Sequence, residues 1–440
     1  MIAESEEVCV EDLIDEIAMG PFGSNIKTDC FVNSGIPVFN GSNLTGFETN
    51  DTALRYVTPE KANSLGNALA SRGDIVITHR GTLGQVAMVP YDSKYPRYVI
   101  SQSQFRIRCN DKVLPKFFVY YFHTREGQWR LLSNKTQTGV PALGRPTSTF
   151  RKLSMPLPTF EKQAKIVQVI DTIQKKIKNN SKLNGYLEEL ADGMFRRHFG
   201  GLTDNATLAD FANVTMGQSP AGSSYNETGI GTIFYQGRAE FGWRYPTQRL
   251  STTEPKRMAK AGDVLMSVRA PVGDLNLAYE DCCIGRGLAA IHCDYPSYGL
   301  YLMRSLHKKL DAYNGEGTVF GSINGKALNG LPIALPNNAA IRAFEKEATP
   351  IDTQIRNNEV ESRALVTLRD TLLPKLMSGE IDVSKVDLTQ LNSHLAEILR
   401  PFGCHIPAIQ KRGSPHSCEP PRTPGYRVIR PTSTTPLLPK

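Results

Sequence analysis

Hydrophobic residues recur along two stretches of the chain at alternating spacings of four and three, the pattern of a coiled-coil helix. The first stretch spans residues 163–199 and the second spans residues 344–376. We therefore predict two long helices, each with one narrow apolar seam. The seam positions are Ile166, Ile170, Ile173, Ile177, Asn180, Asn184, Leu187, Ala191 and Met194 in the first, and Phe344, Ala348, Ile351, Ile355, Asn358, Ser362, Leu365, Arg369 and Leu372 in the second.

Outside these helices, short β-branched runs alternate with Gly and Pro, which is typical of small, irregular α+β domains. One such run occurs twice. Gly73–Ile77 precedes Arg80, and Gly262–Met266 precedes Arg269 at the same spacing. Each run predicts a turn that leads into a short strand and then into a loop.

A constant offset of 178 residues relates the second helical stretch to the first. It maps Leu153–Pro158 onto Leu331–Pro336, and the Lys-Asn-Asn of 178–180 onto the Arg-Asn-Asn of 356–358. Because the offset holds over roughly 45 residues, we infer a tandem duplication. The predicted order is globular unit, long helix, globular unit, long helix.

The predicted fold class is α+β, with two globular domains separated by two long antiparallel coiled-coil helices in a pseudo-two-fold tandem repeat. We call the first domain, 1–155, head 1 and the second, 201–337, head 2; the helical regions are 156–200 and 338–386. Two repeats around a two-fold axis place Asn180 opposite Asn358, where a buried pair fixes the helix register. The alternative is that both residues face solvent.

Composition indicates an ordinary globular protein, with 40% hydrophobic and 21% charged residues. No apolar stretch is long enough to span a bilayer, and no signal peptide is evident, so we expect no membrane association. Eight cysteines without CxxC spacing fit the reducing cytoplasm. The net charge is +8, but residues 401–440 supply +5 of it, so bulk charge does not by itself indicate nucleic acid.

The end of the chain differs in composition. Residues 401–440 hold nine of the 28 prolines, so we expect a disordered tail over 387–440. Cys404-His405 and His416-Ser417-Cys418 leave a zinc site as an alternative there. Elsewhere, the adjacent Cys282 and Cys283 sit in an apolar context and are expected to be buried thiols.

Taken together, the paired Gly-Asp strands, the proline-bounded domain ends and the two helices closely resemble the specificity subunit of type I restriction–modification systems. Lys375–Ile381 completes the pattern, and the resemblance covers residues 8–386. It implies two target recognition domains, each reading one half of a bipartite double-stranded DNA sequence. It also implies that the helices bind two methyltransferase subunits, and that motor-nuclease subunits join for cleavage.

The sequence shows no G-x-x-x-x-G-K-[ST] phosphate loop, no G-x-G-x-x-G fingerprint after a strand and no H-E-x-x-H motif. We therefore expect no catalytic residues, no metal and no cofactor of its own. S-adenosylmethionine, ATP and magnesium would be bound by the partner subunits. Two other functions stay open: a stand-alone enzyme with its site in one head, and a coiled-coil assembly adaptor that never binds DNA.

Base reading uses Arg or Lys for guanine and Asn or Gln for adenine, whereas phosphate contacts need only charge or donors. The candidates are Asn40, Asn43, Arg80, Lys135, Gln137 and Arg145 in head 1, and Gln236, Arg238, Arg244, Arg269, Asn324 and Lys326 in head 2. The alternative for Arg80 and Arg269 is an ion pair with Asp74 or Asp263. Arg106 and Arg108 are expected on a solvated strand face.

Overall fold

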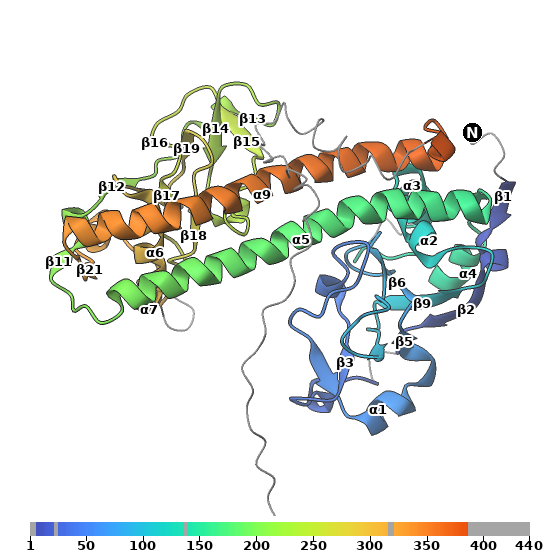
Figure 1. Cartoon of the computed structure of the whole chain (residues 1–440). Coiled ribbons are helices and arrows are strands. Elements are labelled where there is room, and N and C mark those ends of the chain that lie inside the picture. The colour runs from blue at the N-terminus through green and yellow to red at the C-terminus, as the bar shows by residue number, and fades with distance from the viewer. Residues whose placement is uncertain (1–5, 22–24, 136–139, 316–320, 386–440) are drawn as a thin grey trace, which may run out of the picture. The chain divides into compact units, whose positions relative to one another are not determined.

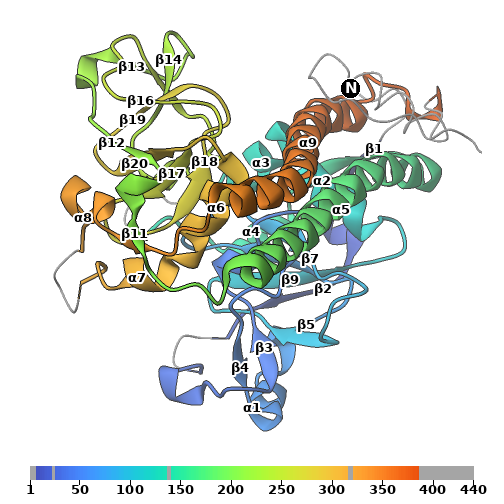
Figure 2. The same ribbon diagram turned by 60° about the vertical axis from the view of Figure 1, so that its left-hand side comes forward.

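Two long helices lie side by side in a computed structural model of the protein (Figures 1 and 2). They are α5, Phe160–Phe199, and α9, Asn338–Ser378, and they confirm the two predicted helices. No helix in the described part of the chain is long and apolar enough to cross a membrane. The structure describes residues 6–21, 25–135, 140–315 and 321–385, so the predicted tail lies outside it.

The long helices run antiparallel, as predicted. Ile173, in the first half of α5, packs with Leu365 in the second half of α9. Towards the opposite ends, the rings of Phe195 and Phe344 meet edge to face, with centroids 5.5 Å apart. Residue numbers therefore rise along α5 as they fall along α9.

Asn180 and Asn358 are buried at the middle of this contact, 4% and 5% exposed, so the solvent-facing alternative is wrong. Their side chains do not pair with each other, however. The Asn358 amide donates to Asn184 Oδ1 (2.7 Å), and the Asn180 amide donates to Glu361 (2.7 Å) and Ser362 (3.3 Å). The 178-residue offset relates Asn184–Asn358 to Asn180–Ser362. The two-fold axis runs between these contacts, because seam side chains interdigitate instead of meeting head-on.

Head 1 contains two four-stranded sheets with the orders β2-β9-β6-β7 and β4-β3-β8-β5. The first is antiparallel throughout, and the second contains one parallel pair, β3 with β8. A separate pair, β1 with β10, joins the two ends of the head. The strands are β1 Glu6–Cys9, β2 Ile14–Met19, β3 Ile36–Val38, β4 Arg55–Val57, β5 Leu69–Ser71, β6 Ile75–Thr78, β7 Val86–Met88, β8 Arg97–Val99, β9 Gln104–Cys109 and β10 Ser154–Leu157; the α-helices are α1 Pro59–Ser64, α2 Pro115–Phe122, α3 Arg125–Leu132 and α4 Pro146–Arg151.

Head 2 repeats this arrangement with the sheet orders β12-β20-β17-β18 and β13-β15-β14-β19-β16. Its second sheet again has one parallel pair, β14 with β19, and β11 pairs with β21 across the ends of the head. The strands are β11 Ala206–Thr207, β12 Asn213–Met216, β13 Tyr225–Asn226, β14 Thr232–Tyr235, β15 Leu250–Thr252, β16 Met258–Ala259, β17 Val264–Ser267, β18 Leu275–Leu277, β19 Cys282–Ile284, β20 Leu288–His292 and β21 Pro332–Ile333; the α-helices are α6 Pro296–Ser305, α7 His307–Asp311 and α8 Gly325–Asn329.

The repeated Gly-Asp run occupies the same place in both heads. β6 and β17 are the third strands of their sheets, and both are entirely buried. Gly73 and Gly262 precede them with φ of 86° and 91°, a backbone conformation that glycine adopts without a steric penalty. The duplication inferred from the sequence is therefore confirmed at the level of the backbone.

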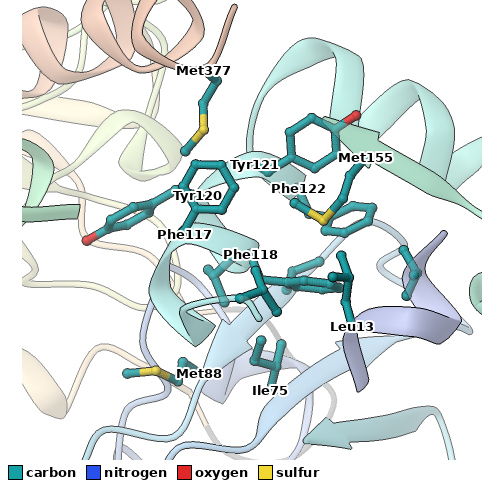
Figure 3. Packing of buried hydrophobic residues seen from close by; sticks show 14 of the residues in the cluster. Leu13, Ile75, Met88, Phe117, Phe118, Tyr120, Tyr121, Phe122, Met155 and Met377 are labelled. Atoms are coloured by element: carbon teal, nitrogen blue, oxygen red, sulfur yellow. The ribbon is translucent and has the colours of Figure 1, made fainter. Parts of the chain in front are cut away.

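Each head packs on both long helices. In head 1, helix α2 is buried from Phe117 to Phe122 and lies between the antiparallel sheet, represented by Ile75 and Met88, and Met377 of α9 (Figure 3). In head 2, Tyr298 of α6 packs with Phe195 of α5 and Phe344 of α9. Both heads thus have hydrophobic cores that continue into the helices.

Candidate nucleic-acid interface

Three predicted contact residues of head 1 meet where three loops join. The backbone of Arg80, after β6, bridges to Ala142, and that of Lys135, after α3, bridges to Leu143. Arg145 comes just before α4, with a left-handed φ of 47°. All three cationic side chains are exposed. We call Arg80, Lys135 and Arg145 junction 1.

Head 2 has the same junction. The backbone of Arg269, after β17, bridges to Ser322 in the way that Arg80 bridges in head 1. Asn324 follows and caps α8 by accepting a backbone amide at 2.9 Å, and Lys326 lies in the first turn of that helix. Their side chains are exposed. We call Arg269, Asn324 and Lys326 junction 2.

The segment after β14 lies beside junction 2. Arg238 opens the short 3-10 helix η7, Arg238–Glu240, and its guanidinium forms an ion pair with Asp274. Asp274 belongs to the same β17–β18 connection as Arg269. Gln236 and Arg238 are both exposed. Five predicted residues of head 2 are therefore carried by neighbouring loops.

The matching segment of head 1 lies beside the β6–β7 connection. Gln85, at the end of that connection, donates to the carbonyl of Gly41 at 2.8 Å. Asn40, partly exposed, caps the 3-10 helix η3 (Gly41–Asn43) by accepting the Ser42 amide at 2.8 Å. Gln85 and Asp274 occupy the same place in the repeat, directly after Gly84 and Gly273. Neither residue was among the predicted contacts, although this spacing identifies both in the sequence.

Asn43 is a correction to the predicted contact set. Its side chain has no exposed surface, and its amide donates to the carbonyls of Asn50 (3.1 Å) and Thr52 (2.8 Å). It satisfies two backbone carbonyls of the loop between η3 and β4. Asn43 therefore shapes the loop and is not available to bind DNA.

Arg244 is a second correction. It is only 3% exposed and forms ion pairs with Asp352 of α9 and Glu188 of α5. Its guanidinium also donates to the Tyr301 hydroxyl at 3.2 Å. The charge of Arg244 is compensated within the protein by two acidic side chains from the long helices, although its buried Nε has no hydrogen-bond partner. Gln137, the remaining predicted residue, lies outside the described residues.

The aspartates offered as partners for Arg80 and Arg269 are bound by other groups. Asp74 pairs with Arg106 (3.5 Å) and Arg108 (2.9 Å) of β9. Arg106 is only 7% exposed, so the predicted solvated face is wrong at Arg106, whereas the Arg108 side chain is 41% exposed. In head 2, Asp263 accepts from His292 Nδ1 at 2.6 Å. The ion-pair alternative for Arg80 and Arg269 is therefore wrong, and both arginines are exposed.

Groups suited to other chemistry are held in structural roles. Burial lowers the pKa of His79, next to Arg80, so its imidazole is neutral at pH 7. Cys282 and Cys283 are fully buried, as predicted, and burial raises the pKa of Cys282 to about 12. Among the described residues, no group of three His, Cys, Asp or Glu side chains could hold a metal ion. The proposed zinc ligands of the tail lie outside them.

Both junctions present an arginine, a lysine and further hydrogen-bond donors. A guanidinium offers a planar pair of donors that fits the major-groove edge of guanine, and an ammonium or backbone amide fits a phosphate. The exposed amide of Gln236 can pair with adenine through its oxygen and its nitrogen. The oxygens of Asn40 and Asn324 accept cap hydrogen bonds, so these residues would offer their amide nitrogens to a base edge. Each head therefore carries exposed hydrogen-bond donors suited to nucleic acid.

Comparison with known proteins gives the same family throughout. Residues 4–189 match the family described as "Type I restriction modification DNA specificity domain". The chain is 27% identical, over 79% of its length and 88% of the relative, to a putative type I restriction enzyme MjaX specificity subunit of Methanocaldococcus jannaschii. It is 22% identical, over 85% and 93%, to the MjaIX specificity subunit of the same organism.

One solved structure supports the fold. The type I restriction–modification S subunit from M. genitalium matches 85% of this chain and 96% of its own, with a TM-score of 0.54 at 16% identity. The duplicated sheets, the antiparallel helices and the relatives agree with the resemblance found in the sequence. The chain is therefore similar to type I restriction–modification specificity subunits over most of its length, and its residues 4–189 match the family model of their DNA specificity domain.

Proposed function

We propose that this protein binds double-stranded DNA and reads a bipartite sequence, with one half-site for each head. The observation that carries this proposal is the repeated junction, which exposes an arginine at the same place in both heads, Arg80 and Arg269. Around these arginines the two junctions carry different side chains. Different donors match different base edges, so the two half-sites differ in sequence.

We further propose that the long helices dock two methyltransferase subunits, to which motor-nuclease subunits are added. Support comes from an apolar stripe on the outer face of α5, where Leu183, Tyr186 and Leu190 are 43%, 57% and 53% exposed. Their spacing of three and four puts them on one helix face, and exposed apolar patches mark protein contacts. The partner subunits then bind S-adenosylmethionine, ATP and magnesium, and this chain contributes no catalytic group. The complex works in the cytoplasm.

The test is to co-express the full chain with its methyltransferase subunits and map the methylated bases of the host genome by single-molecule sequencing. We expect two short recognised sequences separated by a spacer of fixed length and unspecified sequence. Methylation without a sequence motif would overturn the proposal.

Single substitutions assign the half-sites. Arg80→Ala is expected to weaken binding to one half-site and Arg269→Ala to the other, by about 1–3 kcal/mol each if the arginine reads a base. Lys94→Ala, at an exposed cation whose ammonium lies over the Tyr95 ring, is the matched control and should leave both half-sites unchanged. Equal weakening for every DNA sequence would assign the arginine to phosphate.

Two other functions are separated by simple assays. Footprinting of the complex is expected to show two protected half-sites, whereas an adaptor that never binds DNA would protect none. A single-turnover assay of the isolated chain with DNA, nucleotide and magnesium is expected to show no product. Product formed without partners would favour a stand-alone enzyme.

A further inference from the structure

One segment of head 2 joins the exposed Gln236 and Arg238 to the two long helices. Its far end is Arg244, whose guanidinium bridges Asp352 of α9 and Glu188 of α5 while donating to Tyr301. The Tyr301 hydroxyl in turn donates to Asp352 at 2.9 Å. One buried side chain of the head thus contacts both helices of the scaffold.

The same end of the segment has a second attachment to α9. Arg363 donates to the carbonyls of Tyr245 (3.5 Å) and Pro246 (3.3 Å), directly after Arg244. Asp352 and Arg363 are eleven residues apart, which is about three turns, so they lie on one face of the helix. Attachment at two points along one helix face restricts rotation of the segment about either point.

Between its two ends the segment is braced. Glu240, 5% exposed, accepts the Gly237 amide at 3.2 Å and pairs with Arg249 at 2.7 Å. Asn276 of β18 exchanges two hydrogen bonds, each of 3.0 Å, with the backbone of Gly242. Movement at Arg244 is therefore transmitted along the segment instead of being absorbed by a loose loop.

Head 1 attaches its matching segment in another way. Phe47 packs edge-on against Tyr120 (4.8 Å between centroids) and lies 5.2 Å from the Arg369 guanidinium. Glu48 pairs with Lys116 at 3.2 Å, and both side chains are partly exposed. These contacts are apolar packing and a partly solvated ion pair. They restrict the orientation of the segment less than a buried guanidinium that bridges two carboxylates does.

We propose that Arg244 is a positioning residue that sets where Gln236 and Arg238 lie relative to the long helices, and thereby sets the spacer between the two DNA half-sites. This rests on the proposed function. One base pair of spacer corresponds to about 3.4 Å along the duplex and about 35° of rotation, so a small shift of the segment changes the preferred spacer. A planar guanidinium holds its donors in a rigid fork with fixed directions, whereas the ammonium of a lysine is a compact charge on a flexible stem whose donors rotate.

The test uses the full chain in complex with its methyltransferase subunits, with Arg244→Lys and Tyr301→Phe compared with wild type. The readout is the methylated sequence in the genome, and the relative affinity for cognate duplexes with the native spacer and with one base pair more or fewer. Both half-site sequences should remain the same. Discrimination between the native and altered spacers should fall about tenfold in Arg244→Lys and less in Tyr301→Phe.

Arg130→Lys is the control, because Arg130 forms ion pairs with Glu7 and Glu126 inside head 1. It should destabilise that head locally and leave spacer discrimination unchanged. Unchanged discrimination in both head 2 variants would overturn the positioning role, even if their thermal stability fell. Should Arg244→Lys fail to assemble, Tyr301→Phe alone decides. A wild-type complex without a bipartite motif would instead overturn the proposed function.

Discussion

Head 1 and head 2 share one strand order apart from the additional edge strand β13 of head 2, but different kinds of contact attach them to the long helices. In head 1, the buried face of α2 meets Leu373, Leu376 and Met377 of α9. Its clearest ionic link is Lys116 with Asp171 of α5, at 2.8 Å, with side chains 26% and 18% exposed. The attachment of head 1 is therefore mainly apolar.

Head 2 combines an aromatic cluster with buried charge. Phe195 and Phe199 of α5 pack around Phe344 of α9. Beside them, Arg244 and Arg304 bind acidic residues of the helices, and the Arg304 guanidinium forms a bond of 2.8 Å to Glu188. Apolar contacts hold two surfaces together at any compatible angle, whereas buried ion pairs need defined geometry. The two heads therefore share a backbone fold but differ in the contacts that orient them on the long helices.

One contact is the same in both heads. The hydroxyl of Tyr120 binds Asp171, and that of Tyr301 binds Asp352. These pairs are related by 181 residues, whereas the helix seams are related by 178. The difference of three residues is about 4.5 Å along a helix, so the heads sit at unequal distances from the central asparagines.

The largest expected effect comes from the aromatic cluster of head 2. Phe344→Ala should lower the free energy of unfolding of head 2 by about 3–5 kcal/mol, because Phe344 is fully buried and its removal leaves a cavity. The chain has two tryptophans, Trp129 in head 1 and Trp243 in head 2, so single-tryptophan variants report each head separately. Urea unfolding followed by Trp243 fluorescence, in a Trp129→Phe background, measures the change.

Phe160→Ala is the matched control, because Phe160 begins α5 and is 52% exposed. It should change stability by less than about 0.5 kcal/mol. If Phe344→Ala lowers the stability reported by Trp129 as much as that reported by Trp243, the two heads unfold together. That result would overturn the claim that each head has its own attachment.

A smaller effect separates the two ionic attachments. Asp352→Asn leaves Arg244 buried with one counter-ion fewer and should cost head 2 about 3 kcal/mol. Asp171→Asn makes the same chemical change in head 1 and should cost about 1 kcal/mol, because Lys116 is more exposed. Unfolding reported by Trp243 and Trp129, respectively, measures both. Equal losses would show that burial of the pair does not distinguish the heads.

The smallest effect is a pH dependence confined to head 1. Burial lowers the pKa of His123, although its Nε2 bonds the Val86 carbonyl; the charge of Arg369 lowers it further and Asp370 opposes this. The unfolded chain therefore takes up the proton first, and stability falls as pH drops below about 6.5. In head 2 the equivalent residue is Arg304, whose guanidinium stays protonated over this pH range.

Between pH 7.5 and 5.5, wild-type head 1 should lose about 1 kcal/mol more stability than the His123→Gln variant, measured by Trp129 fluorescence. The same measurement on head 2, followed by Trp243 fluorescence, is the comparison, because head 2 has Arg304 in place of His123. A loss of the same size in His123→Gln would place the pH dependence elsewhere in the head.

The sequence by itself determined the repeat and the helices. A seam with alternating spacings is a local pattern, so α5 and α9 could be predicted from their own residues. The 178-residue offset then implied an antiparallel pair, which the contact of Ile173 with Leu365 confirms. Exposed loop cations such as Arg80 and Arg269 could also be proposed, because their place in the repeat is visible without any long-range contact.

Only the tertiary structure decided which polar residues face inward. Arg244 and Arg238 are six residues apart and look alike in the sequence, yet one is buried and the other exposed. The difference depends on Asp352, 108 residues further along the chain, which α9 brings to Arg244. A charged side chain is buried where a distant partner compensates its desolvation, and no local pattern records that partner.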